Sequence, residues 1–199
     1  MTFPAFAEPV TLLALGDSLT QGYGLPADQG FVPQLESWLR DNGAEVTVIN
    51  GGVSGDTSAG GASRIGWALD GSVDAVMVTL GGNDLLRGID PAETRANLDA
   101  ILATVQDKGL PVLLVGMNAL GNYGASYAEA FNAIYPDLAA ARDVPLYPDF
   151  LAGLEALGDR QSVLRDYLQP DAVHPNADGV ARIVAAIGPT ILELVHAAE

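Results

Sequence analysis

The chain has 199 residues, with 9 lysines and arginines against 25 aspartates and glutamates, so its formal net charge is −16. A surface this acidic repels phosphate backbones and anionic lipid headgroups, which argues against a nucleic-acid partner. There is no cysteine, which excludes disulfides, thiolate metal sites and a cysteine nucleophile. Because no apolar run approaches the roughly 20 residues of a membrane span, we expect a globular protein without stable membrane insertion.

The first nine residues, MTFPAFAEP, contain the small-x-small pattern of a signal-peptidase site at Ala5-Phe6-Ala7. Neither a charged nor an apolar segment precedes this pattern. The favoured interpretation is that a signal peptide was removed before expression, which predicts a periplasmic or secreted protein. Alternatively, the pattern is chance and the protein is cytoplasmic. We expect residues 1–9 to be a disordered remnant and residues 10–199 to form a single domain.

Short apolar segments alternate with longer amphipathic segments along the rest of the chain. Segments with apolar residues at both odd and even positions predict strands covered on both faces: 11–15, 46–50, 75–80, 111–115 and 144–147. Apolar residues at helical spacing predict helices: 31–39 with a stop at Gly43, 91–109, 127–141 and 178–198. Pro189 lies inside the last of these helices and is expected to kink it or to break it near Ile187.

This alternation predicts right-handed crossovers and an α/β fold, namely a three-layer doubly wound domain with a central parallel sheet of about five strands. In open parallel sheets, sites form beyond the carboxyl ends of the strands. Polar, glycine-rich loops follow the first three predicted strands: Gly16-Asp17-Ser18-Leu19, 50–57 and Gly81-Gly82-Asn83-Asp84. We therefore expect these three loops to meet at one edge of the sheet.

Ser18 stands directly after the first predicted strand. A strand-to-helix turn would present its hydroxyl near a helix N-terminus, where backbone N–H groups receive an oxyanion. A serine hydroxyl becomes a good nucleophile only when a base takes its proton. The alternative is that Ser18 is an N-cap, with Asp17 and Thr20 as ordinary turn residues.

A carboxylate and a histidine lie together near the other end of the chain, at Asp171 and His174. Their i to i+3 spacing across a loop allows the carboxylate to reach Nδ1 of the imidazole and leaves Nε2 for Ser18. Because Pro175 disfavours helical backbone at the histidine, we expect a turn ahead of the last helix. The alternative is a surface turn with an incidental histidine. The other histidine, His196, lies on a helical pattern and is interpreted as a solvated or packing residue.

The second and third loops carry groups suited to binding a negative charge. Glycines in 50–57 let backbone N–H groups face a ligand, although the loop lacks the lysine of a P-loop and the spacing of a dinucleotide site. The same loop fits a tight turn in which Asp56 or Thr57 caps the next helix. Asn83 in the third loop is either a neutral side-chain donor for an oxyanion or a turn former.

Four blocks of this chain together resemble the SGNH (GDSL-type) hydrolases. In chain order they are Gly16-Asp17-Ser18-Leu19, Val53-Ser54-Gly55-Asp56-Thr57, Gly81-Gly82-Asn83-Asp84 and Asp171-Ala172-Val173-His174-Pro175-Asn176. The resemblance implies the flavodoxin-like fold of that family, with Ser18 as the nucleophile, His174 as the base and Asp171 as the group that orients the base. It also implies an oxyanion hole made by the Ser18 N–H, the Gly55 N–H and the Asn83 side chain.

Within this family, the chain is more similar to the bacterial subgroup of thioesterase I/lysophospholipase L1 enzymes and arylesterases. The similarity rests on Leu85-Leu86-Arg87-Gly88 and on Gly121-Asn122-Tyr123-Gly124. In that subgroup the second segment borders the acyl pocket, which implies Asn122 and Tyr123 as substrate-binding residues. The preceding Asn118-Ala119-Leu120 has no secure counterpart, so the acyl-chain preference is left open.

We therefore predict a serine ester hydrolase that cleaves small aryl or short-chain acyl esters through an acyl-enzyme and requires neither a metal nor an organic cofactor. The resemblance also admits acyl-thioesters and lysophospholipids. Repulsion between the acidic surface and anionic acyl-CoA or acyl-carrier protein places thioesters second. A carbohydrate O-deacetylase and a non-catalytic binding domain on the same fold are further alternatives. The family expectation is a monomer acting on a small-molecule ester.

Overall fold

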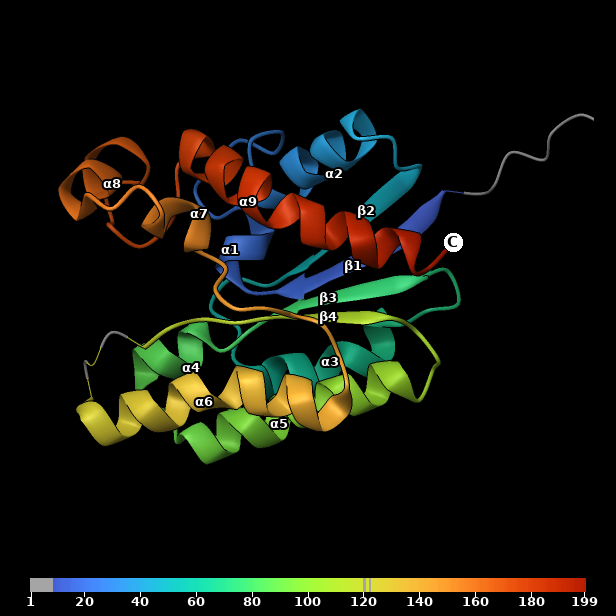
Figure 1. Ribbon diagram of the computed structural model, residues 1–199, viewed down its shortest axis with the longest axis horizontal. Coiled ribbons are helices and arrows are strands. Elements are labelled where there is room, and N and C mark those ends of the chain that lie inside the picture. Colours follow the sequence, from blue (N-terminus) through green and yellow to red (C-terminus); the bar gives the residue numbers. More distant parts are fainter. Residues whose placement is uncertain (1–8, 120, 122) are drawn as a thin grey trace, which may run out of the picture.

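The computed structural model describes residues 9–119, 121 and 123–199. Within these residues, five parallel strands form one sheet with the order β2-β1-β3-β4-β5 (Figure 1). The strands are β1 (Val10–Gly16), β2 (Val46–Gly52), β3 (Ala75–Thr79), β4 (Val112–Val115) and β5 (Leu146–Tyr147). This is a flavodoxin-like doubly wound order. The predicted fold class is confirmed, whereas the predicted disordered segment 1–9 lies, except for Pro9, outside the described residues.

Helices cover both faces of the sheet, so the molecule has three layers. They are α1 (Ser18–Gln21), α2 (Phe31–Asp41), α3 (Ser58–Ala68), α4 (Gly82–Arg87), α5 (Pro91–Gln106), α6 (Ala125–Arg142), α7 (Ala152–Glu155), α8 (Arg160–Asp166) and α9 (Ala177–His196). Helices α2, α7 and α9 lie on one face, and α3, α5 and α6 lie on the other (Figure 1).

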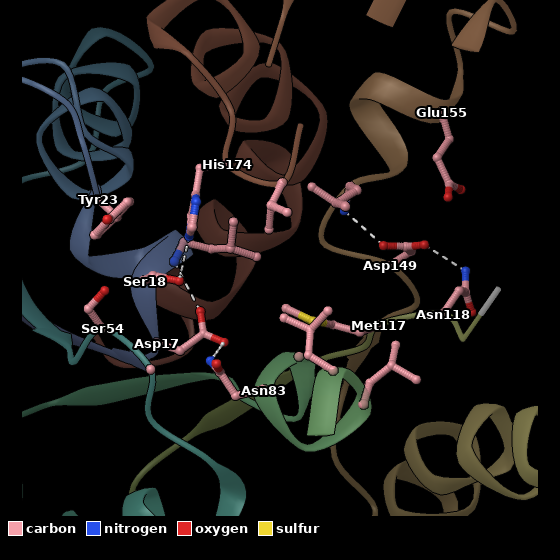
Figure 2. Close-up of a pocket in the computed structure, with 17 residues that line it drawn as sticks. Asp17, Ser18, Tyr23, Ser54, Asn83, Met117, Asn118, Asp149, Glu155 and His174 are labelled. Atoms are coloured by element: carbon pink, nitrogen blue, oxygen red, sulfur yellow. Dashed lines mark hydrogen bonds between the residues drawn. The ribbon is translucent and has the colours of Figure 1, made fainter. Parts of the chain in front are cut away.

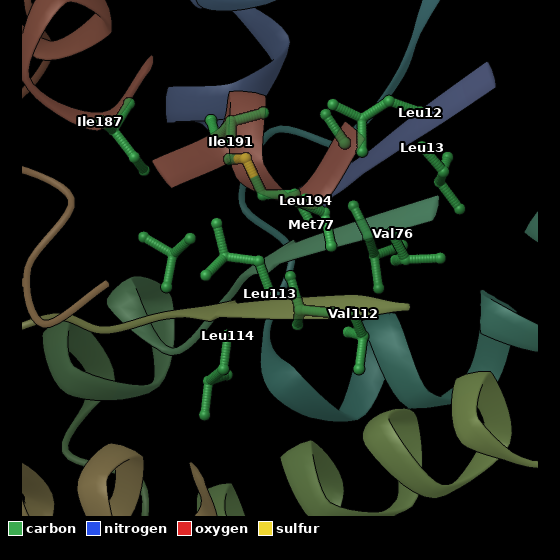
Figure 3. Close-up of a cluster of buried hydrophobic side chains, with 14 of the residues drawn as sticks. Leu12, Leu13, Val76, Met77, Val112, Leu113, Leu114, Ile187, Ile191 and Leu194 are labelled. Atoms are coloured by element: carbon green, nitrogen blue, oxygen red, sulfur yellow. The ribbon is translucent and has the colours of Figure 1, made fainter. Parts of the chain in front are cut away.

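The apolar sequence of the central strands follows from this coverage. All five residues of β3 are buried, and so are Leu12, Leu13, Ala14 and Leu15 of β1. In Figure 3, Ile187 and Ile191 of α9 lie over one face of the sheet, whereas Leu114 of β4 points away from them toward the opposite helices. Edge strand β2 behaves differently, because Val46 and Val48 are buried while the intervening Thr47 is exposed. The central strands are thus buried on both faces, which accounts for their continuous apolar sequence.

The last helix is not broken at its proline. Helix α9 runs from Ala177 to His196 with Pro189 inside it, so the predicted break near Ile187 is wrong. An internal proline costs a helix about 3 kcal/mol. This cost is outweighed by packing, since nine residues of α9 are buried and the ring of Trp38 from α2 lies against Gly188, where even a Cβ would approach the ring to 2.6 Å.

Helix α9 is also long and apolar enough, by composition, to cross a membrane, and it is the one helix of the described residues that meets this criterion. Half of its most apolar window is buried inside the protein. Its apolar stripe packs on α2, α7, β3 and β4, which accounts for the hydropathy without a membrane. We therefore interpret α9 as a core helix.

Candidate active site

The loops that follow the strands enclose a cavity of about 380 Å³ at the carboxyl edge of the sheet. Each strand contributes to its lining: Ser18 follows β1, Gly55 follows β2, Asn83 follows β3, Asn118 follows β4 and Asp149 follows β5. Figure 2 shows Ser18, His174 and Asn83 on one side of this cavity, and Asp149 and Asn118 on the other. The cavity lies where parallel sheets of this kind bind their ligands.

Ser18 is the first residue of α1, so its side chain projects from the junction between strand and helix. Asp17, and not Ser18, is the N-cap, because its Oδ1 accepts the Leu19 N–H at 3.0 Å. The alternative interpretation of Ser18 as a cap is therefore wrong. The turn is tight, since a Cβ at Gly16 would lie 2.0 Å from the hydroxyl oxygen of Thr20. This geometry leaves the Ser18 hydroxyl free to face the cavity.

The structure brings His174 to Ser18 across 156 residues of chain, with the imidazole Nε2 2.9 Å from the serine Oγ. The other ring nitrogen, Nδ1, lies 2.6 Å from Oδ2 of Asp171. The second carboxylate oxygen, Oδ1, accepts the N–H groups of Val173 and His174, each at 3.0 Å. The backbone and side-chain hydrogen bonds from His174, together with the Val173 N–H, lower the pKa of Asp171 to about 2. Asp171 is therefore ionised in the folded protein near neutral pH.

The ring of Tyr23 packs against the imidazole, with the ring centroids of Tyr23 and His174 4.6 Å apart. Tyr23 is reached through Gly22, the left-handed C-cap of α1, and its carbonyl accepts a hydrogen bond from Gln169. Gln169 precedes the Asp171–His174 turn, and its carbonyl accepts a hydrogen bond from the Ala172 N–H within that turn. The sequence analysis missed Tyr23, because nothing in the local pattern indicates that this ring meets the histidine.

Gly55 and Asn83, which are expected to bind an oxyanion together with the Ser18 N–H, line the same cavity as Ser18. Gly55 has a φ of +79°, a backbone conformation that favours glycine. Asn83 is the second residue of α4, so the turn-former interpretation does not apply. Its Nδ2 donates one hydrogen bond to Oδ2 of Asp17 at 3.1 Å. Because an amide carries two N–H donors, the second remains for a ligand.

Asp17 is almost completely buried beneath this site. Burial raises the pKa of its carboxyl group, and the hydrogen bonds from Leu19 and Asn83 oppose that effect. By accepting from both the α1 backbone and the α4 amide, Asp17 fixes the position of Asn83 relative to Ser18. The sequence analysis treated Asp17 only as a turn residue.

Two arginines make contacts that the sequence did not reveal, and these contacts hold the loops in place. Arg64 donates to Oδ2 of Asp56 at 2.8 Å and to the Gly16 carbonyl at 2.9 Å, which joins the loop after β2 to the end of β1. Arg87 donates to the Gly55 carbonyl at 2.7 Å. At the start of α3, Thr57 is the residue that caps the helix, through the Gly60 N–H.

The substrate-binding role predicted for Asn122 and Tyr123 is not tested by the structure. Asn122 lies outside the described residues. Tyr123 is half-exposed and donates to the carbonyl of Leu86, which itself lines the cavity. Its role in binding substrate stays a prediction. His196 is exposed in the last turn of α9. Among residues 9–119, 121 and 123–199, no three histidine or carboxylate side chains are grouped to hold a metal.

Residues 14–182 match the GDSL-like lipase/acylhydrolase family. The chain belongs to this family. Esterase TesA of Pseudomonas aeruginosa is 37% identical over 190 residues, which cover 95% of this chain and 91% of TesA. Thioesterase 1/protease 1/lysophospholipase L1 of Escherichia coli is 39% identical over 198 residues, covering 98% of this chain and 89% of that protein. The crystal structure of AlinE4, an SGNH-hydrolase family esterase, is 44% identical with a TM-score of 0.76, covering 95% and 98% of the two chains.

These matches confirm the resemblance to the SGNH (GDSL-type) hydrolases and the prediction of a serine ester hydrolase of this family. They extend over almost the entire described chain, so the GDSL-like family assignment rests on the whole fold and not on a short motif. The roles of individual residues remain predictions, which the geometry described above makes specific.

Proposed function

We propose that this GDSL-family protein hydrolyses small carboxylic esters through an acyl-enzyme formed on Ser18. The observation that carries the proposal is the chain of contacts from the Ser18 Oγ to His174 Nε2 at 2.9 Å and from His174 Nδ1 to Asp171 at 2.6 Å. This chain opens into a cavity that is also lined by Gly55 and Asn83. The nucleophile is therefore within hydrogen-bond reach of the base, and the base is within hydrogen-bond reach of the orienting carboxylate.

In the proposed mechanism, the Ser18 oxygen attacks the ester carbonyl carbon while its proton passes to Nε2 of His174. The resulting oxyanion accepts hydrogen bonds from the Ser18 and Gly55 N–H groups and from the free N–H of Asn83. When the tetrahedral intermediate collapses, the C–O bond to the alcohol breaks and His174 protonates the leaving alkoxide. Water, deprotonated by the same imidazole, then attacks the acyl carbon. The C–O bond to Ser18 breaks while His174 returns the proton to the serine oxygen, which releases the acid and restores the protein.

The charged Asp171 contributes by stabilising the imidazolium that forms in both steps and by holding the tautomer with its proton on Nδ1. Each oxyanion donor is expected to lower the barrier by roughly 2.7–4 kcal/mol. Asp17 adds to this effect indirectly, because the Asn83 amide that it holds needs little reorganisation when negative charge develops.

The test is hydrolysis of p-nitrophenyl acetate and butyrate by the protein and by Ser18→Ala. We expect the protein to cleave both esters and the variant to lose about 10⁴–10⁶-fold in kcat. Ser63→Ala, which removes an exposed serine hydroxyl on α3, is the matched control and should retain full activity. Undiminished turnover by a folded Ser18→Ala protein would refute the mechanism.

A second candidate substrate class is acyl-thioesters, as named for the E. coli relative, which is 39% identical. The same attack and the same oxyanion donors serve a thioester, so the chemistry does not separate the two. Parallel assays with butyryl-CoA and p-nitrophenyl butyrate measure the preference directly. A kcat/KM for butyryl-CoA above that for the ester would reverse the order that we propose.

We also propose that the protein acts as an exported monomer without stable membrane insertion or nucleic-acid binding. Support comes from the Ala5-Phe6-Ala7 pattern, the net charge of −16 and the buried position of the apolar stripe on α9. Fractionation of cells expressing the natural gene tests the export, and light scattering of the purified protein tests the monomer. Recovery in the cytoplasm, or a dimer mass, would overturn the respective proposal.

A further inference from the structure

The cavity has a polar end opposite Ser18. Asp149 follows β5, and Asn118 follows β4, so their side chains meet across the neighbouring carboxyl ends of these strands. The Asn118 amide donates to Oδ2 of Asp149 at 2.6 Å. Glu155, at the end of α7, lines the same region. Figure 2 shows these three residues on the far side of Met117 from Ser18.

Asp149 is an unusual group to find at the end of an apolar cavity. Only 6% of the residue is exposed to solvent. Its Oδ1 accepts the Leu151 N–H at 2.8 Å, and its Oδ2 accepts Asn118. A carboxylate oxygen can accept two hydrogen bonds, and each oxygen of Asp149 accepts one here, so both retain capacity for a ligand. Burial raises the pKa of Asp149, and burial together with the charge of Asp149 raises that of Glu155.

The stretch between the two polar ends is apolar. Its described lining includes Leu85, Met117, Leu151 and Val173, and no lysine or arginine contributes to the lining anywhere along the part of the chain that the structure describes. The negative potential at the far end is therefore not compensated by a cation within the cavity. A ligand that enters from Ser18 meets hydrocarbon first and a carboxylate last.

We propose that Asn118 and Asp149 determine the acyl specificity of the cavity: they limit the acyl length, favour an acyl tail that ends in a hydroxyl group and reject an anionic tail. This inference rests on the proposed ester hydrolysis. It names the substrate class as esters of short to medium acyl groups, with an ω-hydroxyacyl group as the preferred form. Neither residue takes part in bond breaking, so both act on substrate choice.

Strand spacing gives the length that the cavity accepts. Asn83 follows β3 and Asp149 follows β5, which is two strands away in the sheet, or about 10 Å at a spacing of about 4.8 Å. An extended chain advances about 1.2 Å per bond, as the roughly 3.6 Å of an extended residue of three bonds shows. An acyl group held at the oxyanion donors would thus reach Asp149 with about six to eight carbons. Longer apolar chains would have to desolvate the carboxylate without replacing its hydrogen bonds.

The contact from Asp149 to Leu151 also stabilises the turn into α7, so a purely structural role has to be distinguished. Asp149→Asn is suited to this, because its amide oxygen keeps the bond to the Leu151 N–H while the negative charge is lost. A structural role would predict equal changes for all substrates. The proposal instead predicts a change that depends on the charge and polarity of the acyl tail.

The experiment compares kcat/KM for three p-nitrophenyl esters of equal chain length: the hexanoate, the 6-hydroxyhexanoate and the adipate monoester. The leaving group is the same in all three. For the natural sequence we expect the hydroxyacyl ester to exceed the hexanoate about tenfold and the adipate to fall about tenfold or more below it. Asp149→Asn should bring the adipate to within about threefold of the hexanoate.

A second variant tests the length limit. In the double variant Asn118→Leu, Asp149→Leu, the ratio of kcat/KM for the decanoate to that for the hexanoate should rise about tenfold or more, because the buried polar end is replaced by hydrocarbon. Asp137→Asn removes an exposed carboxylate on α6 and changes the net charge by the same amount as Asp149→Asn, so it serves as the control and should leave all ratios unchanged.

The outcomes are distinct from those of the proposed function. Failure of the protein to cleave any p-nitrophenyl ester would refute ester hydrolysis itself. Cleavage with the same ratios in Asp149→Asn as in Asp137→Asn would overturn the specificity role while leaving the hydrolase intact. If only the double variant fails to fold, the tail-charge ratios of Asp149→Asn still decide the question.

Discussion

At the scale of the residue, the charge of Asp171 sets the pH dependence that we expect. Its hydrogen bonds with His174 lower its pKa to about 2, so the carboxylate stays ionised from about pH 4 to about pH 8. The acid limb of kcat/KM then reports the imidazole, which acts as a base only when neutral. Activity should therefore fall with decreasing pH. A flat profile over this range, measured with p-nitrophenyl butyrate, would contradict a histidine base.

Asp171→Asn is the companion variant for this prediction. The amide keeps the shape of the side chain but removes the charge and allows the wrong imidazole tautomer, so kcat should fall about 10³–10⁴-fold. The backbone bonds from Val173 and His174 to Oδ1 survive in the variant, which preserves the turn. Retention of more than about a tenth of the kcat would argue that this carboxylate does not orient the base.

How far single residues could be predicted depends on how local their contacts are. Asp171 and His174 lie three residues apart, so their pairing follows from the sequence. The contact of Tyr23 with His174 depends instead on a left-handed turn at Gly22 and on a segment 151 positions away, which no local pattern encodes. The pair Asn118–Asp149 similarly joins the ends of two strands whose adjacency is known only once the sheet order is known.

At the scale of the element, buried Asp84 is expected to support the site by joining three helices. It lies in α4 and accepts the N–H and the hydroxyl of Ser58, the first residue of α3, as well as the hydroxyl of Thr94 in α5. Asp84→Ala would leave these buried donors without an acceptor, which should lower the free energy of unfolding by about 2–4 kcal/mol.

Urea denaturation measures this effect, with Asp90→Ala as the comparison. Asp90 is the exposed N-cap of α5 and accepts the Ala92 N–H, so its loss should cost only about 1 kcal/mol. An Asp84→Ala protein as stable as Asp90→Ala would show that the buried bonds contribute little. Because Asp84 adjoins Asn83 on α4, we also expect its variant to lose activity beyond the loss of folded protein.

Most long elements were predictable from the sequence, whereas the short helices were not. The 11-residue helix α3 was missed as well, because its buried residues are Ser58, Gly61 and Ile65, of which only the isoleucine is a large apolar residue. Strands such as β1 and β3 are continuous apolar segments, and helices such as α5 carry apolar residues at helical spacing, so the sequence predicts both. Helices α1, α7 and α8 have only four to seven residues, which is too short for a helical spacing of apolar residues to be recognised. The error at Pro189 has another origin, because local preference was overridden by the packing of α9 on α2.

At the scale of the whole molecule, the alternation of strands and helices predicts a parallel sheet of about five strands, whereas its order, β2-β1-β3-β4-β5, does not follow from the alternation. The organisation of residues 10–199 as one domain stays a prediction. The family match spans residues 14–182, and buried residues from Val10 to Val195 belong to one hydrophobic cluster. We expect a single cooperative unfolding transition, with coincident tryptophan fluorescence and circular dichroism curves. Trp38 packs on α9 and supplies the fluorescence probe of this core. Two separated transitions would contradict the single domain.

The net charge of −16 also acts at the scale of the whole molecule, and it should separate neutral from anionic substrates by their response to salt. The Debye length shrinks from about 30 Å at 0.01 M to about 8 Å at 0.15 M, so repulsion of a distant anion is largely removed over this interval. We expect kcat/KM for butyryl-CoA to rise severalfold between these two concentrations, while that for neutral p-nitrophenyl butyrate stays constant. Because both substrates deliver the same butyryl group to Ser18, the comparison isolates encounter and binding from chemistry. An equal response of the two substrates would show that the surface charge does not govern access to the cavity. A fall of kcat/KM for butyryl-CoA with increasing salt would point to local positive potential at the mouth of the cavity, for example from Arg87 beside Gly55.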